Sequence, residues 1–579
     1  MNHIQLAGVD DVRWKKPKSL PEPIKTVTPR PARPLLPGDS VWPEKSSSET
    51  SEELTPSSRF GQEIPAKLDE AVRRLKSGIA ASSDVIVREL VLSDEGPRAA
   101  VVFVDGLVDK KRIDEYIIGA LRQADRYGLS GAKPGVDLSS VTAILERVLS
   151  VSETKEINQF SEVEAGVLTG DTVLLLDGSS TALDLGTKGW DKRSVSEPQT
   201  ERTIRGPREG FVETLSTNVA LVRREIASPD LRVEYIKVGV RAKRTVALMY
   251  MKGITNPAIV ETARKRLAAI DVDAILSDYA VEYYLQDHFL TPFPLARSTE
   301  RPDFTAREVL NGKLAILTDG SPFSVLFPTV LTDFFRTTDD YTGSYTVVTL
   351  TRFVRLLANF ITFFLAPGYI ALIDVHPDLL PTDLAVSIAG SREGVPFPAI
   401  IEVFLMVIAF EILREGTVRL PGMMGQTIGI VGGLVIGQAA VQAKIVSDIM
   451  VIIIALTAIA SFTNADYQIA ATWRLLLPFL LVVAALFGIY GIALFALLII
   501  AHITSLTSFG VPYTATVSPV YPGGYLDNFI QAPLGMLRTR LLFTRPLDKK
   551  KQKPYRQPME HPDLAAAQKR AERRRGDGQ

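Results

Sequence analysis

The stretch "GIVGGLVIGQAAVQA", residues 429–443, mixes glycine, alanine and larger apolar residues, yet it carries two glutamines four positions apart. Small residues let helices approach closely inside a bilayer, where van der Waals contact drives their association. The glycines therefore predict a helix-packing face, made of Gly429, Gly432, Gly433 and Gly437. The polar Gln438 and Gln442 need a further explanation.

At about 100° per residue, one stripe of this helix carries Val431, Val435, Gln438 and Gln442. In one interpretation each glutamine hydrogen-bonds across a single helix interface while the glycines pack. In the other, the stripe faces water in an oligomeric pore. The valines then form a hydrophobic constriction, and the glutamines line the wider part.

The surrounding sequence is rich in apolar segments, at 354–375, 397–413, 424–443, 447–463 and 475–503. A membrane-spanning helix needs about 20 apolar residues. The first and third segments reach that length, and the second and fourth are near its lower limit. The fifth is too long for one straight crossing and is interrupted at "GIYG" (488–491), so it is tilted, broken or a tight hairpin. We expect an all-α, multi-span membrane domain over 346–510.

The two ends of the chain indicate its orientation. The start has no apolar signal-peptide core, so we expect the amino-terminal region to stay on the cytoplasmic side. Residues 538–579 contain 13 Lys and Arg against 5 Asp and Glu, which also favours the cytoplasm. An even number of crossings is then required, although five segments are present. Either 397–413 lies in the interface or re-enters, or 475–503 crosses twice.

Before the membrane domain, the sequence predicts an α/β region of two small subdomains. Compact apolar runs ending in turns indicate strands, as in "RAAVVFVDGL" (98–107) and "DTVLLLDGSS" (171–180). "NPAIVETARKRLAAI" (256–270) has helical spacing and a proline in its first turn. We place the subdomains at 61–200 and 201–325. A Pro- and Ser-rich head (1–60) is expected to be disordered, and a basic cytoplasmic tail covers 511–579.

The sequence contains little that indicates catalysis. It has no cysteine, and its five histidines are dispersed, with no HExxH pair, P-loop, GxGxxG or GxSxG motif. The Asp-Gly pairs in "LDGSS" and "LTDG" fit turns better than catalytic carboxylates. We therefore expect no enzyme, catalytic residue, metal site or cofactor, and no nucleic-acid partner.

Two groups of charged residues are candidate functional positions. Glu402, Glu411 and Arg414 lie in or beside the second apolar segment. Glu411 and Arg414 suit a simple i,i+3 surface pair, and the alternative is that all three form buried pairs that hold a gate. Arg208 and Glu209 in "GPREGF" (206–211) either belong to a turn before a helix or dock another domain or subunit.

Several long stretches, in the same order along the chain, resemble the A subunit of spore germinant receptors, the GerA family. They are "GPREGFVETLSTNVALVRREI" (206–226), "STERPD" (298–303), "LNGKLAILTDGSPF" (310–323), "SREGVPFPAIIEVFLMVIAFEILREG" (391–416), "RLPGMMGQTIGIVGGLVIGQAAVQAKIVSDIMVIIIALTAIASF" (419–462) and "SFGVPY" (508–513). The chain departs from the family at "RTTDDYTGSY" (336–345), where a stretch close to "QSPEDYY" is expected.

The resemblance implies a protein of the spore inner membrane, with its amino-terminal region on the cytoplasmic (spore core) side. Its implied partners are a transporter-like, nutrient-binding B subunit and a lipoprotein C subunit. It also implies a homo-oligomer, a pentamer, that acts as a nutrient-gated ion channel and starts germination. The basic tail then either binds anionic lipid or only fixes the topology.

Two other functions compete with the channel. A transporter would be expected to show internal repeats and paired broken helices. A non-conducting scaffold that couples a nutrient sensor to the germination machinery would need only the packing of small residues.

One substitution separates the pore from packing. If Val435 forms a constriction, Val435→Ala should leak ions and trigger germination without nutrient, and a bulky replacement should block it. Ion flux through the purified complex measures both effects. Activity that falls only in proportion to the amount of protein would favour packing instead.

Overall fold

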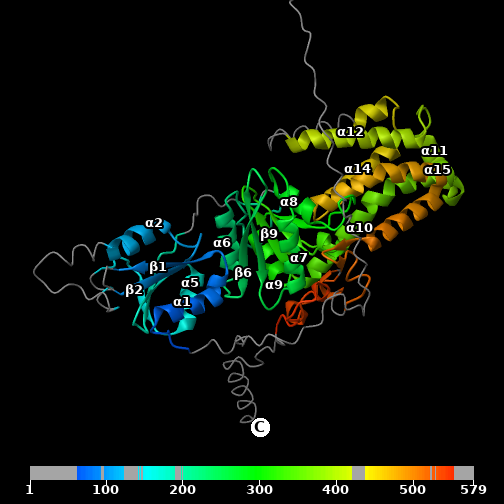
Figure 1. The fold of residues 1–579 in the computed structure, drawn as a ribbon. Coiled ribbons are helices and arrows are strands. Elements are labelled where there is room, and N and C mark those ends of the chain that lie inside the picture. Colours follow the sequence, from blue (N-terminus) through cyan, green and yellow to red (C-terminus); the bar gives the residue numbers. More distant parts are fainter. Residues whose placement is uncertain are drawn as a thin grey trace, which may run out of the picture.

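The computed structural model describes residues 62–92, 97–122, 141, 144, 148–189, 197–198, 200–419, 437–521, 525–528 and 530–552. Two sheet-containing subdomains and a helical region follow one another along the molecule (Figure 1). The head predicted to be disordered and the basic residues after 552 lie outside these ranges.

The first subdomain is a five-stranded sheet with helices on both faces. Its strand order is β1 (Val85–Val91), β2 (Arg98–Val104), β4 (Thr172–Leu176), β5 (Ala182–Leu185) and β3 (Thr154–Ile157), and every pairing is antiparallel. Helices α1 (Leu68–Ser77) and α5 (Phe160–Thr169) cover one face. The helical stretch from α2 (Lys110–Arg112) into Ile113–Gly119 covers the other. Both strands predicted from apolar runs are confirmed.

The second subdomain repeats this topology. Its strand order is β6 (Leu231–Val238), β7 (Arg244–Met251), β9 (Leu314–Thr318), β10 (Ser324–Phe327) and β8 (Arg297–Thr299), again antiparallel throughout. Helices α6 (Leu215–Glu225) and α9 (Pro302–Leu310) pack on one face. Helices α7 (Pro257–Ala268) and α8 (Asp278–Leu285) pack on the other. Asn256 caps α7 and Pro257 begins it, as the sequence predicts.

The Asp-Gly pairs occupy the same place in both subdomains. Asp177 accepts a hydrogen bond from the backbone N–H of Leu68 at 3.0 Å, and Asp319 accepts one from that of Leu215 at 3.4 Å. These donors are the first residues of α1 and α6, so each carboxylate satisfies a free helix N–H. The following glycines, Gly178 and Gly320, have φ of 86° and 79°. The turn interpretation is confirmed for both pairs.

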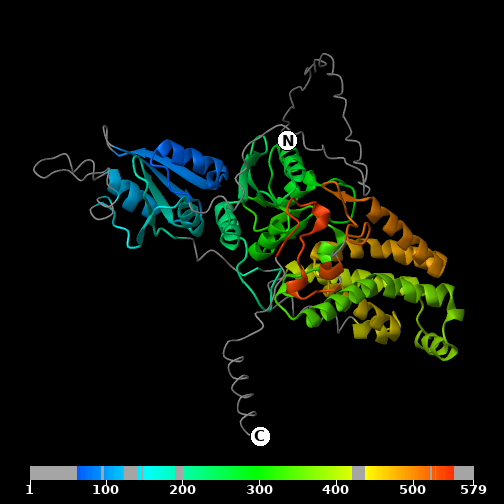
Figure 2. The same cartoon turned by 90° about the horizontal axis from the view of Figure 1, so that it is seen from below.

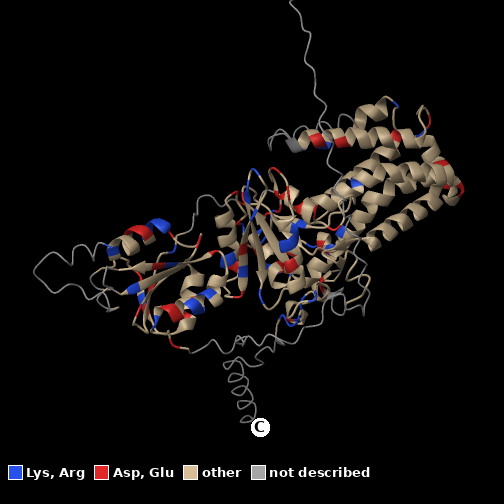
Figure 3. Ribbon diagram, viewed as in Figure 1, with Lys and Arg blue, Asp and Glu red and all other residues tan. Residues whose placement is uncertain are grey.

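The helical region contains α10 (Tyr345–Ile370), which continues to Val375, then α11 (Thr382–Ser391), α12 (Ala399–Arg419), α14 (Asp448–Phe462) and α15 (Tyr467–Ser505). Among the described residues, two helices are long and apolar enough to cross a membrane, Tyr345–Val375 and Tyr467–Ser505. Charged residues are frequent along the two subdomains and sparse along these helices (Figure 3).

Helix α15 is a hairpin that turns at Gly488. This glycine has φ 62° and ψ −143°, a conformation open only to glycine. The two arms return to one loop, because Thr472 donates to the Pro292 carbonyl at 2.7 Å and His502 lies 2.9 Å from the Thr291 hydroxyl. Of the three geometries that the sequence left open for 475–503, the hairpin is the one observed.

The chain after α15 returns to the second subdomain. Strands β11 (Thr507–Ser508) and β12 (Val511–Pro512) and helix α16 (Tyr525–Asn528) follow it. Phe509 packs on Phe327 with ring centroids 4.7 Å apart, and the Leu547 N–H donates to the Ile254 carbonyl at 2.9 Å. Figure 2 shows this red segment against the green subdomain.

Replacing Gly488 should open the hairpin. A Cβ atom at this position would lie 2.4 Å from His376 Nε2, and the backbone conformation adds strain of about 1–3 kcal/mol. Gly488→Ala should therefore lower the unfolding free energy of the detergent-solubilised chain. Gly368→Ala is the matched control, because it sits in α10 with no heavy atom within 4 Å of the added carbon. Equal stability of the two variants would contradict the hairpin.

Candidate functional site

A buried set of charges joins the second subdomain to α10. We call it the junction cluster. It holds four carboxylates and four cations from segments far apart in the sequence: Glu308, Asp333, Asp340, Asp527, Lys313, Arg336, Arg352 and Arg355. Each carboxylate lies beside at least one cation, which a site removed from water requires.

The centre of the junction cluster lies against the sheet. Lys313, which immediately precedes β9, places its Nζ 2.7 Å from both Glu308 Oε2 and Asp333 Oδ2. Arg336 pairs with the other oxygen of Asp333 and lies 4.0 Å from Glu308. Side chains of all four residues are 1% exposed. The subdomain thus presents a fixed ionic core to the helices.

The other half of the cluster belongs to the start of α10. Asp340 accepts from Arg352 Nε and from Arg355 Nη2, both at 2.8 Å. Asp527 of α16 bridges the halves, at 3.6 Å from Arg336 and 3.8 Å from Arg352. The C-terminal segment therefore closes the connection between the subdomain and the helix.

Electrostatics keep the central carboxylate charged. Burial alone would raise the pKa of Glu308, but Lys313 and Arg336 outweigh burial and hold that pKa well below its usual range. Burial likewise opposes ionisation of Asp340, whose pKa is nevertheless lowered by Arg355 and Arg352. Ion pairs in such surroundings are costly to break, because the remaining charge has no water to solvate it.

The charged candidates of the second apolar segment lie in different halves of α12, with Glu402 in its first turn and Glu411 and Arg414 in its second half. Glu402 is fully buried, 3.3 Å from Arg392, and accepts from the Ser447 N–H at 2.9 Å. Glu411 pairs with Arg414 at 3.1 Å and with Arg474 of α15 at 3.7 Å. Glu402 therefore belongs to a buried pair, and Glu411 to a half-exposed one that also reaches another helix. A gating role for them stays a prediction.

Part of the glycine-rich stretch lies outside the described residues, namely Gly429, Val431, Gly432, Gly433 and Val435. Residues 437–442 are helical. Gly437 is buried, and a Cβ added there would lie 3.7 Å from Val451 of α14. Gln438 and Gln442 are exposed on the same helical stretch.

Arg208 and Glu209 form exposed local pairs, with Glu197 at 4.0 Å and Arg224 at 3.1 Å. Their docking role stays a prediction. The contact between the subdomains uses other residues. Arg223 of α6 pairs with Asp84 at 2.9 Å, with both side chains buried, and the Val233 N–H donates to Ser82 Oγ at 2.8 Å.

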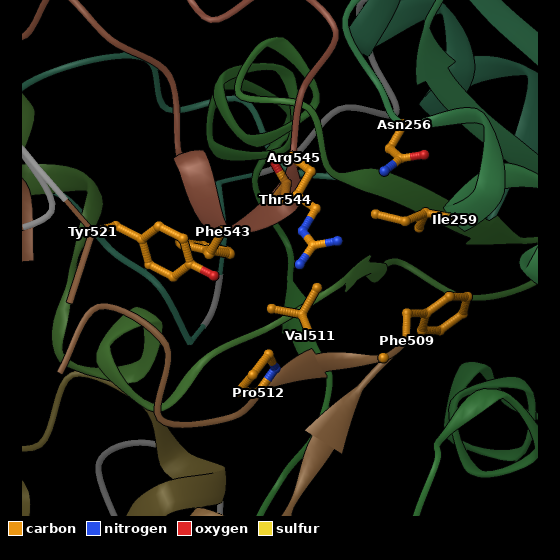
Figure 4. Close-up of a pocket in the computed structure, with 10 residues that line it drawn as sticks. Asn256, Ile259, Phe509, Val511, Pro512, Tyr521, Phe543, Thr544 and Arg545 are labelled. Carbon is orange, nitrogen blue, oxygen red and sulfur yellow. The ribbon is translucent and has the colours of Figure 1, made fainter. Parts of the chain in front are cut away.

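A small cavity of about 20 Å³ lies where the C-terminal segment meets α7. Its lining includes Asn256, Ile259, Tyr521 and Arg545, and the guanidinium of Arg545 points toward its centre (Figure 4). This space suits about one water molecule rather than a nutrient. Within the described ranges, no three His, Asp or Glu side chains gather as metal ligands would.

The fold and the junction define a class: a soluble region of two duplicated antiparallel units, tied by buried charge to apolar helices long enough to enter a bilayer. Comparison with known proteins agrees. The family model "Bacillus/Clostridium GerA spore germination protein" matches residues 73–542, and the chain belongs to this family. Membership gives it a role in spore germination.

Individual relatives cover most of the chain. Spore germination protein GerLA of Bacillus cereus is 40% identical over 478 residues, 83% of this chain and 96% of its own. The uncharacterized membrane protein YfkQ of Bacillus subtilis (strain 168) is 38% identical, over 81% of this chain and 90% of its own. The crystal structure of the N-terminal domain of the A subunit of the Bacillus megaterium germinant receptor GerK3 is 28% identical, with a TM-score of 0.36, over 47% of this chain and 98% of that chain.

Removing one central charge should destabilise the protein strongly. Lys313→Met leaves Glu308 and Asp333 buried beside each other with one partner fewer, a loss of about 3–5 kcal/mol of unfolding free energy. Chemical denaturation of the purified chain measures this loss.

The control is Lys265→Met, which removes an exposed pair with Glu261 and should change stability by no more than about 0.5 kcal/mol. The double change Glu308→Gln with Lys313→Met should recover part of the loss. If Lys313→Met behaves like the control, the central charges of the junction cluster do not stabilise the protein.

Proposed function

We propose that this chain is the membrane subunit of a nutrient germinant receptor complex and that several copies form a nutrient-gated ion channel. The observation that carries the proposal is the outward placement of Gln438 and Gln442 beside the buried Gly437. The glycine packs within the protomer, which leaves the two amides for a partner or for water. In a ring of protomers, such a stripe suits the wall of an aqueous path.

The path of the chain supports a membrane domain within 346–510. Helix α10 begins at the junction cluster, and its extension ends beside Gly488 at the hairpin tip. Helix α12 runs back toward the second subdomain. At its start, on the side of the helical region farthest from that subdomain, Glu402 pairs with Arg392. Further along, Arg414 donates to Ser461 near the end of α14. At Lys444, which lies beside Gly394, the chain is again on the side far from the second subdomain.

Helix α14 runs back toward the second subdomain. The first arm of α15 leads away from that subdomain, and the second arm leads back to it. The described helices therefore begin and end beside the second subdomain, which fits an even number of crossings. An even number leaves the region 61–325 and the segment after 505 on one side, and the basic tail favours the cytoplasm, the core side of the spore inner membrane.

Coupling in this scheme runs through the junction cluster. The B and C subunits that the family resemblance implies would deliver the nutrient signal. A shift of the second subdomain would then reach α10 through Asp340 and Asp527. A chain that serves only as a scaffold shares this linkage but predicts no dependence of ion flux on the glutamines.

The test replaces both glutamines in the assembled complex. Gln438→Leu with Gln442→Leu makes the stripe apolar and should reduce nutrient-evoked cation flux in proteoliposomes by about tenfold or more, the effect of a barrier raised by about 1.4 kcal/mol. Gln438→Asn with Gln442→Asn keeps the amides and should retain flux. Unchanged flux in the leucine variant, at equal protein level, would exclude these side chains from the conduction path.

A further inference from the structure

An exposed apolar patch follows the outer face of α8 and the loop after it. We call it the α8 patch, and it consists of Tyr283, Tyr284, Phe289 and Leu290. Leu290 is 86% exposed and Phe289 is 61% exposed. The Tyr283 ring packs edge-on against Tyr284, with centroids 5.5 Å apart, and against Phe289 at 6.2 Å. The rings thus form one surface cluster.

The patch is not needed to close the core of the subdomain. The inner face of α8 already fills the core, because Val281 and Leu285 are fully buried against the sheet. A helix of eight residues therefore buries one apolar face and keeps a second in the open. A cluster of this kind on a soluble surface usually marks a contact with another phase or molecule.

The loop that carries Leu290 is attached to the membrane-side helices. The next residue, Thr291, lies 2.9 Å from His502 at the end of α15, and the Pro292 carbonyl accepts from Thr472 near its start. Phe293 packs against Trp473, with ring centroids 5.8 Å apart. Helix α8 lies on the side of the subdomain that carries the helices (Figure 1). The α8 patch thus lies next to α15, whose exposed apolar residues include Leu494 and Leu497.

We propose that the α8 patch inserts into the headgroup region of the bilayer that surrounds α15, and that it anchors the second subdomain to the membrane surface. Aromatic rings with one polar edge favour this interfacial depth, where tyrosine hydroxyls stay hydrated and leucine and phenylalanine reach the acyl chains. This inference rests on the membrane placement proposed above. Its ligand is the lipid interface itself, with no requirement for a particular headgroup.

The absence of cysteine permits a direct test, because an introduced cysteine is the only thiol of this chain, which is labelled before the complex is assembled. Leu290→Cys carries a spin label in the complete receptor complex, reconstituted in phosphatidylcholine–phosphatidylglycerol vesicles. Two references accompany it. Leu494→Cys reports the outer face of α15, and Val91→Cys, 65% exposed on β1, reports the water-facing first subdomain.

The measurement is collision of each label with oxygen, which partitions into lipid, and with a water-soluble nickel complex. The label at 290 should resemble that at 494, with oxygen collisions exceeding nickel collisions, and the label at 91 should show the reverse. A label at 290 that resembles the one at 91 overturns the inference. Low accessibility to both reagents also overturns it, because another protein surface, such as a second copy of the chain, then covers the patch.

The label at position 494 distinguishes a failure of the membrane placement from a failure of the anchoring alone. If the label at 494 meets the nickel complex, the membrane placement is wrong and the anchoring fails with it. If the label at 494 is in lipid and only the label at 290 is not, the membrane placement stands and the anchoring alone is rejected.

Discussion

This structure depends on one constraint, which is that each buried charge has to be paired with an opposite charge. Lys313, Glu308, Asp333 and Arg336 lie away from water, and each is held by opposite charge rather than by solvent. A group of this kind resists gradual deformation, because moving one member leaves another unpaired. The junction cluster therefore keeps the second subdomain and the start of α10 in one defined arrangement, and a rearrangement has to exchange partners within the set.

The two subdomains share one topology, but the junction cluster belongs to the second. Counted back from the Asp-Gly turns, Lys313 in the second subdomain corresponds to Asp171 in the first. Asp171 pairs at 3.0 Å with Lys188, whose side chain is 45% exposed. The two subdomains thus share strand order and helix caps, whereas among the described residues the buried ionic surface that reaches the helices belongs to the second. The first is joined to the second by the buried pair of Arg223 with Asp84.

Local patterns predicted much of the fold, because compact apolar runs, Asp-Gly turns and Pro257 act over a few residues. The hairpin stayed one of three options, since the contact between Gly488 and His376 joins positions more than 100 residues apart. The junction cluster was missed for the same reason. Its members run from 308 to 527, and each alone resembles a surface charge. A signal was present in "RTTDDYTGSY", the family departure, which contains Arg336 and Asp340.

The return of the chain after α15 has a consequence for the order of synthesis. The sheet of the second subdomain is complete once Phe327 has left the ribosome, but Phe509, which packs on it, emerges much later. In between, the whole helical region has to be synthesised. The nascent chain therefore holds a folded sheet with an uncovered apolar surface until the C-terminal segment is made, and such a surface is prone to aggregation in the meantime.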